Sequence, residues 1–232
     1  MGYLDVVKSI RGLTHYYPLN DVYGPKDAVG GHNGVNSGAT FGAKGATFNG
    51  SSSVRLPDHG DFSVATNRGL TILVFQTITD WQGKGGNREY IHWAGKGKPG
   101  AHEWTFRHYI PGGGGEAPTR PKRTSFYHFK PGGGEGAGSY FQDDDAAGVE
   151  RVIVGTCDMS TISMWKNGAK RDSDPLSGYS VTPRNTASDV YLGTRGDGTG
   201  FMVGRLRRVA FFDRVLTEAK IKKLYDNRAM AE

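Results

Sequence analysis

The sequence predicts an all-β protein, a two-sheet antiparallel jelly-roll sandwich with a short C-terminal helix. About a dozen short segments of strand character recur at near-regular spacing, and turns rich in Gly and Pro separate them. The chain has 232 residues, with 36 Gly, 10 Pro, 11 Phe, 11 Tyr and 4 Trp, so a few large aromatic side chains can fill a core between many turns. This length is within the range of one sandwich, and we therefore expect a single domain over residues 1–232.

The first half of the chain supplies a helix and several strands. Tyr3–Ile10 can form a short amphipathic helix, and Leu13–Leu19 has the character of a first strand. Leu70–Thr79 is a nearly continuous apolar and β-branched run, which predicts a central strand buried on both faces. Glu89–Ala94 is expected to pair with it. Further short strands are expected at Ala46–Asn49 and Ser53–Leu56.

The second half ends in a helix. Thr161–Arg171 is predicted to be a hairpin, because Asn167-Gly168 between two strands favours a type I′ turn. Thr217 is the expected cap of a helix at one edge of the sandwich, with Leu216 and Ile221 spaced as a hydrophobic staple. Three more strands are expected at Val149–Thr156, Asp189–Thr194 and Gly204–Phe212.

Two strand-like segments in the middle of the chain carry the most informative pattern. His102–Ile110 and Arg123–Lys130 flank a loop that contains Gly112–Gly115, and a second Gly-rich turn, Gly132–Gly134, leads into Ser139–Gln142. Both Gly runs are interpreted as flexible hairpin loops. With a period of two, one face of the paired strands is apolar and the other is polar and aromatic. The polar face is predicted to display Arg107, Tyr109, Arg123 and Tyr127 together.

This polar aromatic face is a candidate ligand-binding surface. Tyr109 and Tyr127 offer flat, rigid rings for the C–H groups of a sugar, and Arg107 and Arg123 offer donors for hydroxyls or acidic sugars. Trp81, next to the Gly- and Lys-containing loop Gln82–Arg88, is a further candidate for stacking on a sugar. The same residue types are enriched at protein interfaces, so a subunit contact is the alternative.

Composition limits the other function classes. The net charge is +6, but the basic residues are scattered and accompany no nucleic-acid-binding motif, so no nucleic-acid partner is expected. The single Cys157 forms no internal disulfide and fits assembly in a reducing compartment as a buried thiol. Met1–Gly12 lacks the features of a secretory signal, and no membrane span is expected.

Several pieces of the chain, taken in order, resemble a known family. They are THYYPLND, DAVGGHNGV, GATFNGSSSVRLP, TISMWKNGAKRD, DVYLGTR and GRLRRVAFFDRVLTEAKIKKLYD. Together they look like the concanavalin A-like lectin/glucanase superfamily, in its laminin-G/pentraxin-like branch, across residues 3–227. The segment FRHYI…RTSFYHFKPGGGEGAGSYFQDD is similar to a subset of such domains in bacteriophage structural proteins and bacterial surface proteins.

The resemblance implies binding without chemistry. We expect a non-catalytic, lectin-like module on a virion surface, assembled in the host cytoplasm as a phage tail or capsid-decorating component that is part of an oligomer or larger assembly. Its partner is then a host-surface glycan or a neighbouring virion protein. A purely structural assembly role without glycan binding is the alternative.

Catalysis is the less favoured hypothesis. Glucanases of the superfamily carry two carboxylates about four residues apart on one strand. No such pair is present. Asp143-Asp144-Asp145 is interpreted as a solvated turn in preference to a metal-binding site. A polysaccharide lyase needs a Tyr or His base beside an Arg. Its residue types are present at Arg107, Tyr109, His92, Tyr127 and His128, without the strand motifs of those lyases.

Calcium is the one cofactor that the resemblance implies. Asp27 and Asn33 match the acidic turn near the N-terminus, but Arg207 and Arg208 stand where acids of the last strand are expected. Guanidinium groups repel a cation, so an ion-pair or turn role for Asp27 is the preferred interpretation. His15, His32, His59 and His102 show no metal-ligand spacing.

Overall fold

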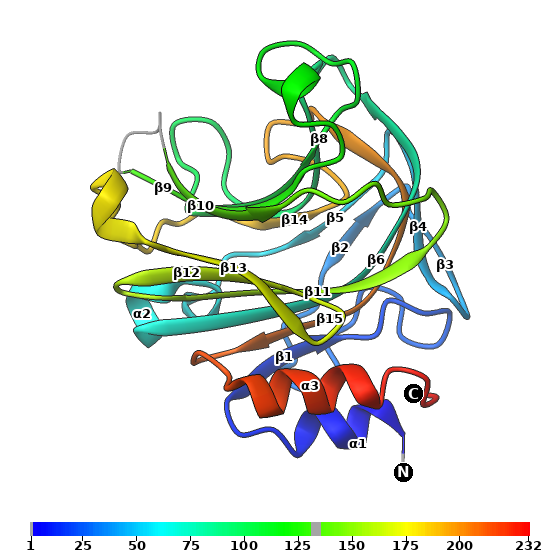
Figure 1. Cartoon of the computed structure of the whole chain (residues 1–232). Coiled ribbons are helices and arrows are strands. Elements are labelled where there is room, and N and C mark those ends of the chain that lie inside the picture. The colour runs from blue at the N-terminus through cyan, green and yellow to red at the C-terminus, as the bar shows by residue number, and fades with distance from the viewer. Residues whose placement is uncertain (1, 131–135) are drawn as a thin grey trace.

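Two antiparallel sheets pack face to face in the computed structural model, which describes residues 2–130 and 136–232 (Figure 1). The first sheet has the order β13 (Ala169–Pro175), β12 (Thr161–Lys166), β11 (Glu150–Asp158), β6 (Gly69–Lys84), β15 (Phe201–Phe212), β4 (Gly45–Asn49) and β3 (Thr40–Gly42), and β1 (Leu13–Tyr17) also pairs with β15. The second has the order β10 (Gly136–Phe141), β9 (Thr124–Phe129), β8 (Trp104–Tyr109), β7 (Tyr90–Lys96), β14 (Val190–Leu192), β5 (Ser53–Leu56) and β2 (Val35–Ser37).

Short helices complete the structure. The α-helices are α1 (Tyr3–Lys8), α2 (Val64–Asn67) and α3 (Glu218–Asp226), and the 3₁₀ helices are η1 (Gly60–Phe62), η2 (Ala117–Thr119) and η3 (Leu176–Tyr179). The predicted fold class is confirmed: the protein is an all-β, jelly-roll-like sandwich with a short C-terminal helix. The predicted turn Gly132–Gly134 lies outside the described residues.

β6 is the centre of the first sheet, as its apolar run predicts. It pairs with β11 on one side and with β15 on the other, and residues 69–78 are all buried. The expectation that Glu89–Ala94 pairs with this strand is wrong. That segment forms β7 in the second sheet, between β8 and β14, because β11 and β15 already occupy both edges of β6.

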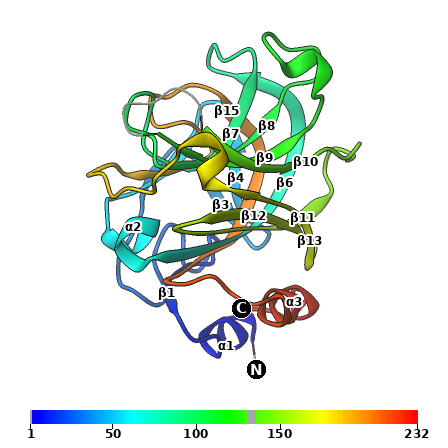
Figure 2. The ribbon, with the colours of Figure 1, turned by 60° about the vertical axis from the view of Figure 1, so that its left-hand side comes forward.

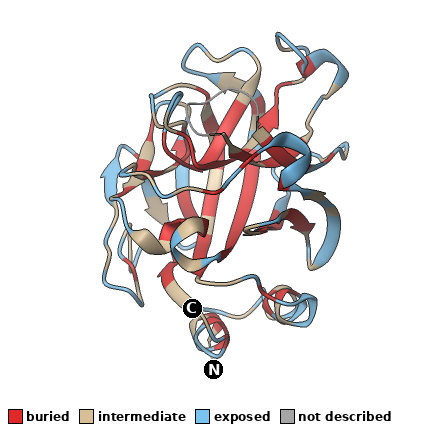
Figure 3. Cartoon of the chain, turned by 90° about the vertical axis from the view of Figure 1, so that its left-hand side faces the viewer, coloured by how far each residue is buried: buried red, intermediate tan, exposed pale blue. Residues whose placement is uncertain are grey.

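Aromatic rings from the second sheet fill the space between the sheets. Trp93, Phe106 and Phe126 form a stack, with ring centroids 4.7 Å apart for the first two and 4.3 Å apart for the last two. Gly155 of β11 lies against this stack, and a Cβ atom there would stand 2.4 Å from Phe106 Cζ. The absent side chain therefore allows the two sheets to approach. Figure 3 shows the buried strands facing one another across this core.

The C-terminal helix lies on the outer face of the first sheet, beside α1, rather than at the edge of the sandwich as predicted (Figure 2). Ile221 and Leu224 of α3 pack in one apolar cluster with Leu73 and Phe75 of β6. The physical reason is that β6 is apolar on both faces. Its outward side chains need a cover, and the two terminal helices provide it.

The hairpin between β12 and β13 is confirmed. Asn167 and Gly168 both have positive φ, at 53° and 81°. This is the geometry that a type I′ turn requires at its two central positions.

Cys157 is buried, and its burial raises the pKa of the thiol well above its usual value. No helix among the described residues is long and apolar enough to cross a membrane.

Four histidines are buried in or beside the second sheet: His92, His102, His108 and His128. Burial lowers the pKa of His102 to about 4 and that of His128 to about 3. It also lowers the pKa of His92 and of His108 well below the usual value. All four imidazoles are therefore neutral in the folded protein at pH 5 to 7.

We expect the protein to lose stability as the pH falls from 7 to 5. The unfolded chain takes up protons on these histidines below about pH 6.5, whereas the folded chain does not, so His102 and His128 each contribute a loss of about 2 kcal/mol in the free energy of unfolding at pH 5. His92 and His108 act in the same direction. Urea denaturation at the two pH values measures the loss. Asp174 opposes it, because burial and the neighbouring Asp172 raise its pKa to about 6.

His128→Gln is the variant that isolates one histidine. It should reduce the difference in unfolding free energy between pH 7 and pH 5 by about 2 kcal/mol, because the unfolded variant has one proton fewer to bind. An unchanged difference would show that His128 is not held neutral by the fold.

Candidate binding site

Successive side chains of β8 and β9 point to opposite faces of the sheet, and this alternation determines which of them point away from the core. Phe106 and Phe126 face directly across the two strands and point inward, so Arg107, Tyr109 and Tyr127 emerge on the outer face of the second sheet. β7 adds Tyr90, which lies opposite Tyr109 in the strand pairing. The structure thus brings Arg107, Tyr109, Tyr127 and Arg123 to one surface, as the period of two predicts.

These residues line a groove of about 680 Å³ on that outer face. Its aromatic lining consists of Tyr90, Tyr109, Tyr127, Phe129, Tyr140 and Tyr179. Its charged lining consists of Arg107, Arg120, Arg123 and Glu116. The lining residues come from β7, β8, β9, β10, η3 and the loop around η2. A volume of this size suits a small organic ligand or a short stretch of a polymer.

Arg107 is held between two tyrosine rings. Its guanidinium carbon lies 3.9 Å from the ring centroid of Tyr90 and 4.4 Å from that of Tyr127. This cation–π arrangement fixes the planar fork in position while leaving its nitrogen atoms for hydrogen bonds. Nε of Arg107 is buried and has no partner among the described residues. The two ring contacts therefore hold the guanidinium in one orientation.

Tyr109 forms the floor of the groove rather than a free stacking surface. Only 1% of the residue is exposed, and the ring of Tyr90 covers it edge-on at 4.8 Å. Its hydroxyl accepts a hydrogen bond of 3.1 Å from Nη1 of Arg120. The interpretation of Tyr109 as a flat face for a sugar therefore needs correction, because neighbouring side chains occupy both its ring and its hydroxyl.

The exposed aromatic surface lies at the rim instead. Tyr140 of β10 is 42% exposed and Tyr179 of η3 is 44% exposed. Among the described residues these are the exposed aromatic side chains, and both line this groove. The guanidinium carbon of Arg123 lies 4.2 Å from the ring centroid of Tyr140, and Arg123 Nε donates to Gln142 Oε1 at 3.2 Å.

Tyr140 and Tyr179 are not among the site residues that the sequence predicted. A period of two through Ser139–Gln142 places Tyr140 on the face opposite Phe141, so the signal for Tyr140 was present in the strand. Tyr179 stands in a short 3₁₀ turn with no periodicity, and only the tertiary structure brings it to the groove.

Trp81 is not part of the groove, contrary to the sequence-based prediction. It is 9% exposed and belongs to the core between the sheets, where its ring lies 5.0 Å from that of His108. Lys122 and Arg151 lie over the ring at 5.6 and 5.2 Å. No free face of the indole remains for a sugar.

The turn at Asp27 does not fit a calcium ion. Both carboxylate oxygens of Asp27 accept hydrogen bonds from N–H groups, namely His15 Nδ1 at 2.8 Å, Tyr16 N at 3.0 Å, Val29 N at 3.0 Å and His32 N at 3.1 Å. Burial alone would raise the pKa of Asp27, but these hydrogen bonds hold it below its usual value. Calcium needs six to eight oxygen ligands with free lone pairs. The lone pairs of the Asp27 carboxylate already accept hydrogen bonds. Asp27 has the turn role, in which it accepts hydrogen bonds from His15 and from the backbone of the turn.

The carboxylates of the described residues do not form a hydrolytic pair in the groove. Glu116 is the acidic residue that lines it, and Glu116 pairs with Arg120. Asp143 accepts from both Nη atoms of Arg171 and from Lys166, which holds the pKa of Asp143 well below its usual range. The Asp143-Asp144-Asp145 turn is therefore an ion-pair cluster.

The candidate residues of a lyase site do not lie together on one face of the second sheet. His128 is buried with its side chain on the core side of β9, away from Arg107 and Tyr127. His92 lies on the outer side, but it is 2% exposed and its Nδ1 is hydrogen-bonded to Thr105 Oγ1 at 3.1 Å.

Two solved structures with a similar fold are binding domains of botulinum neurotoxins. The receptor-binding domain of botulinum neurotoxin C/D mosaic serotype is 10% identical, with a TM-score of 0.67 over 94% of this chain and 51% of that one. The ligand-binding domain of botulinum neurotoxin serotype D, in complex with N-acetylneuraminic acid, is 10% identical, with a TM-score of 0.66 over 96% of this chain and 53% of that one. The chain thus spans about half the length of the neurotoxin domains that it matches.

A third structure matches along nearly its whole length. Domain 4 of AbnA, an extracellular arabinanase from Geobacillus stearothermophilus, in complex with arabinotriose, is 15% identical, with a TM-score of 0.62 over 92% of this chain and 98% of that one. At such identities the likeness shows a shared fold.

Sequence comparison gives the family. No curated protein matches the chain. The family model of the concanavalin A-like lectin/glucanases superfamily matches residues 48–222, more than half of the chain. Together with the two-sheet architecture, this match shows that the chain belongs to the concanavalin A-like lectin/glucanases superfamily.

Proposed function

We propose that the protein is a non-catalytic carbohydrate-binding module whose site is the groove on the outer face of the second sheet. One observation carries the proposal. The exposed aromatic side chains of the described residues, Tyr140 and Tyr179, stand at the rim of the same groove in which Arg107 and Arg123 have no acidic partner among those residues.

The chemistry of a sugar matches these groups. A pyranose or furanose ring has C–H faces that pack on an aromatic ring, and hydroxyls that accept from a guanidinium fork. Arg107 is already immobilised between Tyr90 and Tyr127, so little side-chain entropy is lost when it binds. The complexes of two fold neighbours with arabinotriose and N-acetylneuraminic acid support the proposal.

An acidic glycan is the preferred ligand. Three guanidinium groups line the groove, and the carboxylate of Glu116 neutralises the positive charge of Arg120. Arg107 and Arg123 are thus available to a carboxylate or sulfate, which an arginine binds through two parallel hydrogen bonds.

The groove lacks the groups for bond cleavage. A lyase base must give up its proton near neutral pH, but burial raises the pKa of Tyr90 and of Tyr127 above the usual tyrosine value. Tyr109 is covered. Glu89 lies beside Glu116, but its carboxylate accepts hydrogen bonds from the Tyr90 hydroxyl at 2.6 Å and from the backbone N–H of Glu116 at 3.2 Å. Glu116 itself pairs with Arg120, so neither carboxylate is free for the acid and base roles that hydrolysis needs.

The resemblance to bacteriophage structural proteins adds a proposed context. The module is a component of a phage tail or capsid surface, where it contacts a host glycan. The structural alternative places a neighbouring virion protein in the groove, since Tyr and Arg are also the residues of interface hot spots.

Tyr140→Ala should weaken glycan binding about three- to tenfold, because it removes one stacking face worth roughly 0.5–1.5 kcal/mol. A glycan array of neutral and acidic oligosaccharides identifies the ligand, and isothermal titration calorimetry measures the dissociation constant. Tyr140→Phe is the matched control and should bind like the wild type.

Arg107→Lys tests the contribution of the planar guanidinium group in the same binding measurement. It keeps the positive charge but loses the planar fork, so we expect affinity for an acidic glycan to fall roughly tenfold or more. Equal affinity of wild type, Tyr140→Ala and Arg107→Lys for an array ligand would place the binding site elsewhere.

No turnover of polysaccharide is expected. Incubation with β-glucans, arabinan, alginate and glucuronan should release neither reducing ends nor unsaturated uronates, because the groove offers no free acid or base. Product formation that disappears in Tyr127→Phe would overturn the non-catalytic assignment.

The structural alternative has its own signature. If the groove serves glycan binding, the isolated protein should stay at one sedimentation coefficient over a wide concentration range while it binds the array ligand. A blank array, together with concentration-dependent self-association that Tyr140→Ala abolishes, would favour the assembly role.

A further inference from the structure

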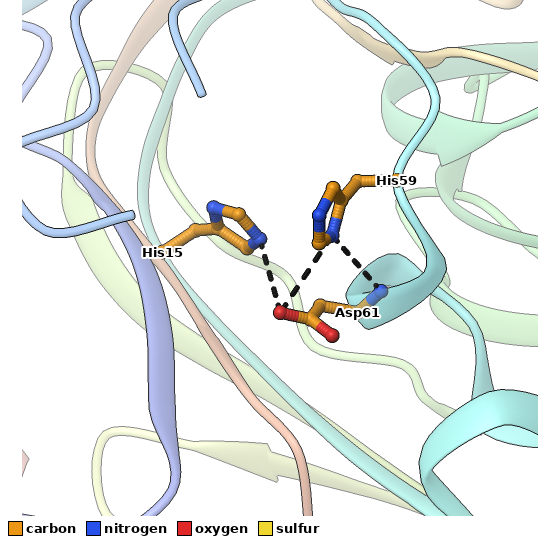
Figure 4. Close-up of side chains that lie close together, drawn as sticks. All are labelled: His15, His59 and Asp61. Carbon is orange, nitrogen blue, oxygen red and sulfur yellow. Dashed lines mark hydrogen bonds and ion pairs between the residues drawn. The ribbon is translucent and has the colours of Figure 1, made fainter. Parts of the chain in front are cut away.

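We propose that His15, His59 and Asp61 form a binding site for a divalent transition-metal ion of the zinc class. The three residues come from β1, from the position before η1 and from η1 itself (Figure 4). None of them lines the groove. One ligand atom from each lies within 4.8 Å of the others. The proposal does not depend on the function of the groove.

The buried imidazole of His15 provides the strongest observation. Its side chain is 3% exposed, and its Nε2 atom has no hydrogen-bond partner among the described residues. Nε2 points toward the carboxylate of Asp61 at 3.5 Å, as Figure 4 shows. An unpartnered buried nitrogen loses its hydration without compensation, so the site is arranged for a ligand to that atom.

Asp27 sets which nitrogen of His15 is free. Its Oδ2 atom bonds His15 Nδ1 at 2.8 Å, so Nδ1 carries the proton and Nε2 presents its lone pair to the cluster. A carboxylate behind a metal-binding histidine has this same role in known zinc sites. Gly30 allows the close contact, because a Cβ atom there would stand 2.5 Å from His15 Nδ1 and 2.7 Å from Asp27 Oδ2.

The spacing suits tetrahedral coordination. Bonds of about 2.0–2.2 Å to nitrogen and oxygen place two tetrahedral ligand atoms about 3.4 Å apart. Oδ2 of Asp61 lies 3.5 Å from His15 Nε2 and 3.6 Å from His59 Nδ1. Both distances exceed an ordinary hydrogen bond, and both match two edges of such a shell.

His59 can adjust to complete the site. Its Nδ1 accepts a long hydrogen bond of 3.3 Å from the backbone N–H of Asp61, and its side chain is 45% exposed. A small side-chain rotation exchanges this bond for a metal bond. The ring of Phe62 lies 4.7 Å from that of His15 and closes the buried side.

The donor set indicates the class of ion. Two imidazole nitrogens and one carboxylate oxygen suit zinc and its neighbours, whereas calcium and magnesium prefer oxygen ligands. His32 lies nearby and its Nε2 donates to the carbonyl oxygen of Pro57 at 2.7 Å, but it is not among the residues whose ligand atoms lie within 4.8 Å of one another. Three protein ligands leave a fourth position open to water or another ligand.

Zinc titration of the full chain tests the site. Isothermal titration calorimetry with Zn²⁺ should show one tight site per chain, and added Zn²⁺ should raise the melting temperature. His59→Gln and Asp61→Asn should each raise the dissociation constant at least about tenfold, since even residues behind metal ligands contribute that much. Both side chains are at least partly exposed, so these variants should still fold.

Two controls separate this site from adventitious binding. His32→Gln changes a neighbouring histidine that is not one of the three clustered ligands, and it should bind Zn²⁺ like the wild type. Excess Ca²⁺ should neither displace Zn²⁺ nor raise the melting temperature. The proposal is overturned if His59→Gln and Asp61→Asn bind Zn²⁺ as tightly as the wild type, or if no site is filled at one equivalent.

Discussion

The contact between the Phe106–Phe126 stack and Gly155 determines the rest of the structure. The two rings lie 4.3 Å apart and nearly parallel, and they press against the backbone of β11 where a side chain would collide with them. In a strand, a one-residue slip moves every side chain to the opposite face. With Phe106 and Phe126 fixed in the core, Arg107 and Tyr127 have no alternative to the outer face.

The terminal helices decide which sheet face carries the groove. The inner faces of both sheets are used by the core, and α1 and α3 cover the outer face of the first sheet through Tyr3, Val7, Ile221 and Leu224. The outer face of the second sheet has no helix layer over it (Figure 1). Loops and short 3₁₀ turns border it instead, and such segments supply the variable walls of binding sites on a rigid scaffold.

The sequence patterns predicted those structural features that depend on residues close together in the chain. The Asn167-Gly168 turn and the alternation of β8 and β9 depend on neighbours in sequence, and both could be inferred before the structure. Tyr179 and Glu116 reach the groove from separate turns, and β7 joins the second sheet because the edges of β6 are filled. These facts depend on sheet order, which periodicity does not contain.

The same limit explains Trp81 and the histidine cluster. Trp81 follows a strand and precedes a polar loop, and in sequence this looks like an exposed position. In the structure β6 continues past it and the indole lies under Lys122 and Arg151. His15 and His59 are far apart in sequence, and their separation corresponds to no helix or strand spacing. Only the packing of η1 against β1 brings them together.

Buried polar atoms without partners distinguish the two proposed sites from the ordinary core, but only where several such groups converge. Arg208 is as buried as His15, yet its guanidinium donates to Glu232 and to the carbonyls of Arg228 and Met230, so it is a structural tie. The indole nitrogen of Trp93 also lacks a partner, and its ring stacks on Phe106 and His108 inside the core. The free nitrogen of His15 faces the Asp61 carboxylate at 3.5 Å, and Arg107 belongs to the lining of the groove. An unpaired group costs roughly 1–3 kcal/mol of stability. A bound ligand removes this cost, and the neighbouring polar groups give the ligand a defined orientation.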